Sequence, residues 1–226
     1  MNITYYGHAC FQIECKGKSM LFDPFIRGNE LAKSVEIANI RPEYILISHA
    51  HGDHTADAVE IATQSQATCV GVYELVAHLQ KQGVPHIHPM NIGGSWNFGD
   101  FKATLTPAIH SSSFDDGTYG GIAAGFIVEC DETTFYFAGD TALFSDMKLI
   151  AERYKPQFAF LPIGGNFTMD VVDAIAAAQL LGVAEVIGMH YDTFGYIKID
   201  HNEAIEQFKQ AGITLTLLTI SSTIQR

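Results

Sequence analysis

The sequence is poor in basic residues: 13 Lys and Arg stand against 25 Asp and Glu, which gives a formal net charge of −12. So little basic surface cannot neutralise a long run of phosphates, which argues against DNA and RNA as substrates or partners. A small anionic substrate is not excluded by this balance, because a bound divalent metal ion can dominate the local electric field.

Long apolar runs are also missing. No stretch approaches the ~20 apolar residues that a membrane-spanning helix requires. The opening MNITYYGHAC lacks both the basic segment and the long apolar segment of a secretory signal peptide. We therefore expect a cytoplasmic protein without a membrane span. Oligomeric state cannot be predicted from these features.

Cysteine is scarce, and its four positions are scattered. Cys10, Cys15, Cys69 and Cys130 occur singly among apolar residues. They have neither the dense spacing of a disulfide framework nor the paired spacing of a thiolate zinc site. We expect all four to be reduced, buried packing residues.

The chain is rich in short apolar segments that alternate with helical ones. With 47% hydrophobic residues in a length of 226, it can bury a large core, and we expect one domain over residues 1–226. The pattern predicts strands near 3–6, 10–15, 19–22, 44–47, 67–72, 101–107, 122–130, 133–138, 158–162, 184–189 and 214–220. It predicts helices near 56–65, 73–82, 145–153, 170–181 and 202–211. The chain is therefore of the α/β class.

The two halves of the chain resemble each other. FQIECKGKSMLF at 11–22 aligns without gaps on FIVECDETTFYF at 126–137, an offset of 126 − 11 = 115. RPEYILIS at 41–48 aligns on KPQFAFLP at an offset of 114, and ATCVG at 67–71 aligns on AEVIG at an offset of 117. Three matches in the same order predict two similar halves related by a pseudo-two-fold axis, with equivalent loops at one edge of a layered core.

The segment SHAHGDHT at 48–55 crowds four coordinating side chains after the apolar run YILI. Neutral imidazole and carboxylate bind Zn²⁺, Mn²⁺ and Fe²⁺, and two such ions some 3.5–4 Å apart need roughly six or seven donors. This segment supplies His49, His51, Asp53 and His54. His110, Asp140 and His190 each end another apolar run and bring the candidate donors to seven.

The order and approximate spacing of these donors resemble the metal-ligand series of the metallo-β-lactamase superfamily. TYYGHACFQIE and LFDPF resemble its uncharacterised metal-dependent hydrolase group. That group is similar in turn to ascorbate-phosphate lactonases and to phospholipase D-type enzymes that cleave N-acyl phosphatidylethanolamines. The resemblance implies a four-layer αββα sandwich of two pseudo-symmetric halves, in agreement with the internal offsets.

The resemblance also implies a mechanism. His49, His51 and His110 would bind one ion, Asp53, His54 and His190 would bind the second, and Asp140 would bridge the two. The ions would be Zn or Mn. A hydroxide held between them would hydrolyse a small-molecule ester, lactone or phosphodiester, with Asp53 as the catalytic residue that orients it.

Several other residues keep two interpretations. His8 either supports the site and faces the substrate or makes a structural hydrogen bond, and Asp23 either orients a ligand histidine or stabilises a turn with Pro24. Asn166 either donates to a substrate oxygen or only forms a turn. Tyr191 and Tyr196, beside His190, could shape a pocket wall. His86 and His88 share a strand face but have no third donor nearby, and we interpret them as surface histidines.

Two alternative functions remain open. One is a mononuclear iron oxygenase or redox enzyme on the same fold, and the other is a non-catalytic metal-binding module. The presence of both Asp53 and His54 favours two filled metal sites. Metal content separates the first alternative from the hydrolase, because an oxygenase would hold one iron per chain.

Overall fold

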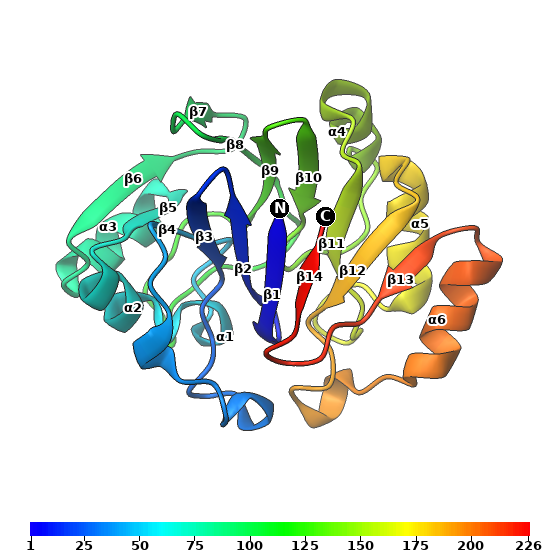
Figure 1. The fold of residues 1–226 in the computed structure, drawn as a ribbon, viewed down its shortest axis with the longest axis horizontal. Helices are drawn as coiled ribbons and strands as arrows, with labels where there is room; N and C mark the ends of the chain where they lie inside the picture. Colours follow the sequence, from blue (N-terminus) through cyan, green and yellow to red (C-terminus); the bar gives the residue numbers. More distant parts are fainter.

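Two seven-stranded mixed sheets pack against each other in the computed structural model, which describes residues 1–226 (Figure 1). The first sheet has the order β14 (Thr223–Gln225), β1 (Asn2–Gly7), β2 (Cys10–Cys15), β3 (Lys18–Phe22), β4 (Tyr44–Leu46), β5 (Thr68–Val72), β6 (His86–Met90). The second sheet has the order β7 (Ser95–Asn97), β8 (Lys102–Pro107), β9 (Ala124–Cys130), β10 (Thr133–Phe137), β11 (Phe158–Pro162), β12 (Glu185–Met189), β13 (Thr214–Thr216).

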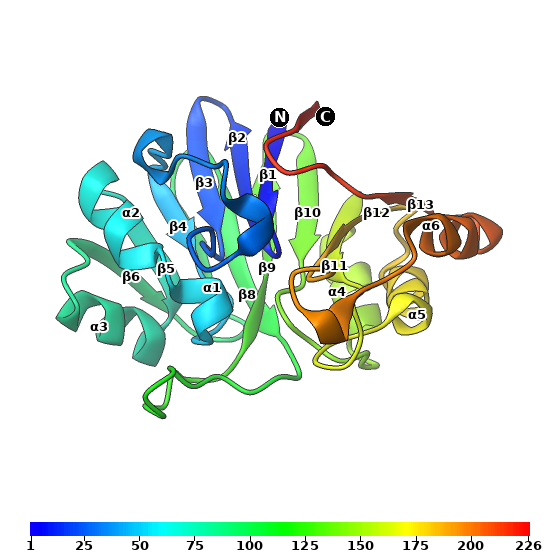
Figure 2. The same cartoon turned by 90° about the horizontal axis from the view of Figure 1, so that it is seen from below.

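Helices cover the outer faces of both sheets, as Figure 2 shows from below. The first sheet carries α2 (Ala58–Ser65) and α3 (Tyr73–Lys81), and the second carries α4 (Met147–Tyr154), α5 (Val171–Leu181) and α6 (His201–Gln210). The short α1 (Gly52–Thr55) follows β4, and 3₁₀ turns span Glu30–Ala32, Ile37–Asn39 and Gly195–Ile197. The predicted αββα sandwich is confirmed. No helix is both long and apolar enough to cross a membrane.

The predicted internal symmetry is visible in the strand pairing. In each sheet, three consecutive strands pair antiparallel, and the next three strands continue the sheet with parallel pairing. The strands β1 to β6 of the first sheet therefore correspond, in order, to β8 to β13 of the second. The terminal strand β14 pairs antiparallel with β1, as β7 pairs with β8. The offsets read from the sequence therefore relate β2 to β9, β3 to β10, β4 to β11 and β5 to β12.

A continuous cluster of 63 buried apolar residues fills the space between the sheets and under the helices. Phenylalanines dominate where the hairpins meet: the rings of Phe22 on β3 and Phe137 on β10 stack with centroids 4.6 Å apart. Both side chains are fully buried. Burying an aromatic ring of this size stabilises the fold by roughly 2–3 kcal/mol, so this contact fixes how the two halves pack.

The prediction of four reduced cysteines is wrong for two of them. Cys15 at the end of β2 and Cys130 at the end of β9 form a disulfide, with their Cα atoms 6.5 Å apart. Cys10 and Cys69 are buried free thiols, as expected. Local cysteine spacing does not show the pair, because its members are 115 residues apart and become neighbours only when the two sheets pack.

The predicted elements differ from the structure mainly at sheet edges. The edge strands β7 and β14 lack a predicted counterpart, because three-residue segments with exposed side chains carry little apolar periodicity. The strand expected over 214–220 ends at Thr216. The helix expected over 56–65 begins at Ala58 and is preceded by α1.

Candidate metal centre

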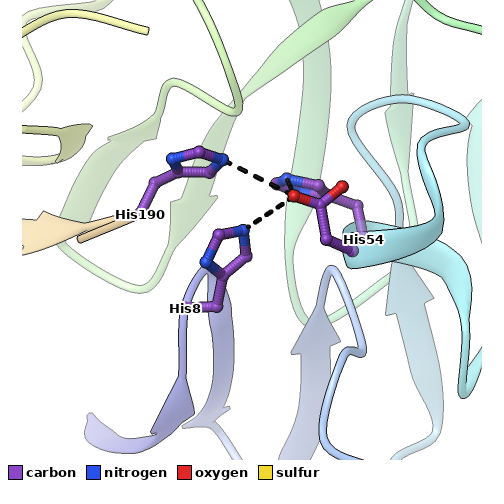
Figure 3. Close-up of side chains that lie close together, drawn as sticks. His8, His54 and His190 are labelled. Atoms are coloured by element: carbon purple, nitrogen blue, oxygen red, sulfur yellow. Dashed lines mark hydrogen bonds and ion pairs between the residues drawn. The ribbon is translucent and has the colours of Figure 1, made fainter. Parts of the chain in front are cut away.

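The candidate donors meet at one edge of the sandwich because they follow the carboxyl ends of strands. His8 follows β1, the 49–54 segment follows β4, His110 follows β8, Asp140 follows β10 and His190 follows β12. Figure 3 shows His8, His54 and His190 pointing toward one another from three separate segments. Residues far apart in the chain are thereby brought together by topology alone.

Three of the seven predicted donors form a first group. Ring nitrogens of His49, His51 and His110 lie within 4.8 Å of one another. His49 Nε2 and His51 Nδ1 are only 3.0 Å apart. A second group joins Asp53, His54 and His190 within the same limit and includes His8.

The Asp140 carboxylate lies between the two groups. Its Oδ2 is 2.9 Å from His190 Nε2 and 3.4 Å from His54 Nε2 on one side. On the other side it is 3.5 Å from His110 Nε2 and 3.9 Å from His49 Nε2. The structure thus brings all seven predicted donors into one cluster, with Asp140 at its centre; their role as metal ligands stays a prediction.

Backbone geometry shows that the chain is held in unfavourable conformations here. His8, Asp23 and His190 have φ angles of 57°, 41° and 56°, in the left-handed region that non-glycine residues rarely adopt. Such residues cost on the order of 1 kcal/mol each and cluster at functional sites. A backbone hydrogen bond of 3.0 Å from His190 N to His8 O fixes two of them together.

Gly139 explains how Asp140 reaches the centre. This glycine has φ +61°, and a Cβ there would lie 2.8 Å from Ala124 O and 2.7 Å from Ser48 Cβ. A larger residue would push the Asp140 loop away from the segment that carries His49. The Gly-Asp pair after β10 is therefore required by close packing between the two halves.

The buried Asp23 supports one histidine of each group. His54 Nδ1 donates to Asp23 Oδ2 at 2.8 Å. Ser48 N and Oγ also donate to this carboxylate, at 2.7 and 2.6 Å. Since the Ser48 hydroxyl proton is used there, its oxygen accepts from His49 Nδ1 at 2.9 Å. Both histidines therefore present Nε2 to the cluster, and the interpretation of Asp23 as an orienting residue is favoured over a turn alone.

His8 supports Asp53 in a similar way. Its Nε2 lies 3.1 Å from Asp53 Oδ2, and its Nδ1 lies 2.9 Å from the Thr193 hydroxyl. The His8 side chain is fully buried, so it contacts the site through Asp53 rather than facing a substrate. Asn166 is exposed and makes no side-chain hydrogen bond; the structure does not bring it to the cluster.

Charge interactions among these groups are strong. Burial would raise the pKa of Asp140, but His190 and His54 hold it well below its usual value. Burial would likewise lower the pKa of His190, yet Asp140 raises it to about 9. Burial, together with His190, lowers the pKa of His8 to about 4, so this ring is neutral near pH 7.

The cluster also leaves polar atoms without partners. His54 Nε2, Asp140 Oδ1 and His190 Nδ1 are buried and have no hydrogen-bond partner. An unsatisfied buried polar atom costs about 1–3 kcal/mol. Converging imidazole nitrogens and carboxylate oxygens are donors that suit Zn²⁺ and Mn²⁺, and an ion in the cluster would give His54 Nε2 a partner. The residues present therefore fit a metal centre.

A cavity of about 750 Å³ opens beside the cluster. Of the residues named from the sequence, it contacts His51, Asp53, His110, Asp140, His190 and Tyr196; the others that line it are Ser111, Phe167, Thr193, Phe194 and Gly195. The sequence suggested that Asn166 contacts the substrate, but its neighbour Phe167 is the residue that lines the cavity. Tyr191, the other expected wall residue, is buried away from the lining. An aromatic side chain in a glycine-rich loop after a strand was the available signal for Phe167.

The two surface histidines on β6 are separate from this cluster. His86 is exposed, and the His88 ring packs against Trp96 with centroids 5.1 Å apart. Neither belongs to a group of donors that could hold a metal ion. The interpretation of both as surface histidines agrees with this placement.

The sandwich and the site at its edge define a metallo-β-lactamase fold. The family model of the beta-lactamase superfamily domain matches residues 19–191. The chain is 49% identical over 225 residues to a "UPF0173 metal-dependent hydrolase" of Flavobacterium johnsoniae, with 100% of both chains covered. A protein of the same name from Methylacidiphilum infernorum is 49% identical, with 99% of both chains covered.

Solved structures agree. The metallo-hydrolase Igni18 of Ignicoccus hospitalis superposes with a TM-score of 0.89 at 35% identity, covering 99% of this chain and 97% of that one. The chain therefore belongs to the beta-lactamase superfamily and, within it, is a metal-dependent hydrolase of the group to which these bacterial relatives belong. The predicted family and enzyme class are confirmed; the resemblance to lactonases or phospholipases is not.

Proposed function

We propose that this protein is a dinuclear Zn- or Mn-dependent hydrolase that cleaves a small ester, lactone or phosphodiester. His49, His51 and His110 would hold one ion, and Asp53, His54 and His190 the other. Asp140 would contact both. The observation that carries the proposal is the position of Asp140 Oδ2, within 4 Å of imidazoles from both groups.

Bound divalent ions would polarise the oxygen of the scissile group and acidify a water molecule. Side chains of the protein would orient this water and accept its proton. The Asp53 carboxyl is about one quarter exposed and faces the cavity, while His8 holds its Oδ2 from behind. It can therefore accept a hydrogen bond from the attacking water, orient it and receive its proton. The buried Asp23 and Ser48 keep the histidine rings in position during this step.

Metal analysis tests the proposal directly. Protein purified without added metal is expected to contain two equivalents of Zn or Mn per chain by mass spectrometry. Removal with a chelator should abolish hydrolysis of a simple lactone and of bis-p-nitrophenyl phosphate, and Zn²⁺ or Mn²⁺ should restore hydrolysis of at least one of them. A single iron per chain, with no hydrolysis after reconstitution, would instead favour the oxygenase.

Asp23→Asn should weaken metal binding by about 10- to 100-fold, because an amide nitrogen cannot accept the hydrogen bonds from His54 and Ser48. Competition with a chromophoric chelator measures this change. Asp57→Asn is the matched control: Asp57 is also buried, but its Oδ2 accepts from the backbone N–H groups of Ile26 and Arg27. Equal metal affinities for the two variants would show that Asp23 does not orient ligands.

A further inference from the structure

The cavity beside the cluster has two chemically different sides. One side consists of the histidines and carboxylates described above. The other is an aromatic wall made by Phe167, Phe194 and Tyr196. Phe167 lies in the loop after β11, whereas Phe194 and Tyr196 lie in the loop after β12. The rings of Phe167 and Tyr196 meet edge to face, with centroids 6.3 Å apart.

This wall is unusually exposed for its residue types. Phe167 is 51% exposed and Tyr196 is 79% exposed. Phe194 is more firmly held, because it packs against Phe25 and against the His8 ring that contacts Asp53. Large apolar side chains left in water beside a cavity of this size mark a surface that a ligand covers. The wall therefore extends from the rim of the cavity to the His8 ring, which contacts Asp53.

Charge decides which kind of ligand fits this wall. None of the eleven residues that line the cavity is Lys or Arg. The face of an aromatic ring carries partial negative charge, so an anionic group against the wall would be repelled by it and would find no Lys or Arg side chain beside it. A cationic group would also be disfavoured, because the proposed pair of divalent ions on the floor of the cavity would repel it.

We propose that the substrate carries an uncharged, flat apolar group that packs against Phe167, Phe194 and Tyr196 while its scissile bond lies over the His and Asp cluster. This inference rests on the proposed function for the position of the scissile bond. It assigns a neutral group to the aromatic wall; the small anionic substrate that the sequence left open would have to place its charge over the proposed ions instead. Phe167 and Tyr196 are then residues that determine specificity.

Three lactones that share the same scissile bond test the proposal on the metal-loaded enzyme: γ-butyrolactone and its γ-phenyl and γ-carboxy derivatives, followed by titration of the released acid. The phenyl compound should have the highest kcat/KM, by about tenfold over γ-butyrolactone. The double variant Phe167→Ala/Tyr196→Ala should lose this preference. Tyr73→Ala, which removes another exposed tyrosine at the start of α3, should keep it.

A binding measurement tests the aromatic wall independently of the proposed hydrolase function. Saturation-transfer NMR should detect neutral phenylacetamide on the metal-loaded wild type and on Tyr73→Ala, but only weakly on the double variant. If neither a lactone nor bis-p-nitrophenyl phosphate is hydrolysed while this binding pattern holds, the proposed function fails and the aromatic wall stands. Hydrolysis that favours the carboxy compound, or that is equal for all three, overturns the wall. Stronger binding of tetramethylammonium than of phenylacetamide overturns it too.

Discussion

Asp140→Asn is expected to lower kcat/KM by a factor on the order of 10³ or more and to leave the enzyme with less than its full metal content. Asp140 is the carboxylate whose Oδ2 lies within 4 Å of His49 and His110 in one group and of His54 and His190 in the other. An amide keeps the shape but loses the negative charge that would compensate the two proposed cations. Losing part of a metal centre costs several kcal/mol of transition-state stabilisation, which corresponds to this factor.

The measurement needs activity and metal content on the same sample. Asp146→Asn, an exposed aspartate just before α4, is the control and should retain both. Far-UV circular dichroism should be the same for wild type and Asp140→Asn, because the buried core does not depend on this side chain. Wild-type turnover by Asp140→Asn with two ions bound would remove Asp140 from the proposed centre.

The candidate site could be predicted from the sequence because its donors have a clear local signal. Each lies in a segment that follows an apolar strand, and the carboxyl ends of neighbouring parallel strands meet at one edge. His8 and Asp23, which support the donors, could also be singled out from the sequence, but their hydrogen-bond pairings have no such signal. The bond between His8 and Asp53 joins positions 45 residues apart, and the one between His8 and Thr193 spans 185, so only the folded chain reveals them.

The sequence predicts the fold as two similar halves. The alignment of these halves also contains information on contacts between them that the sequence analysis did not use. Residues near a two-fold axis meet their own equivalents. Phe22 and Phe137 are 115 positions apart and stack, and Cys15 and Cys130 are separated by the same 115 and are bonded. An alignment of the two halves that matched cysteine on cysteine was therefore the available signal for the disulfide.

This disulfide should contribute about 5 kcal/mol to the free energy of unfolding, because it closes a loop of 115 residues in the unfolded chain. Reduction should therefore lower the midpoint of urea unfolding, and the double variant Cys15→Ser/Cys130→Ser should show the same lowered midpoint without reductant. Both measurements follow intrinsic fluorescence or circular dichroism at fixed metal content.

The controls distinguish the cross-link from other effects of reductant. The double variant should not respond further to reductant, since its remaining thiols, Cys10 and Cys69, are free and buried. Thiol titration of the denatured wild type should give two free thiols when oxidised and four when reduced. Because Cys15 and Cys130 lie at strand ends away from the His and Asp cluster, reduction should leave kcat/KM unchanged well below the unfolding midpoint. A midpoint that does not move on reduction would contradict this prediction and would show that the reduced unfolded chain already keeps its two halves close together.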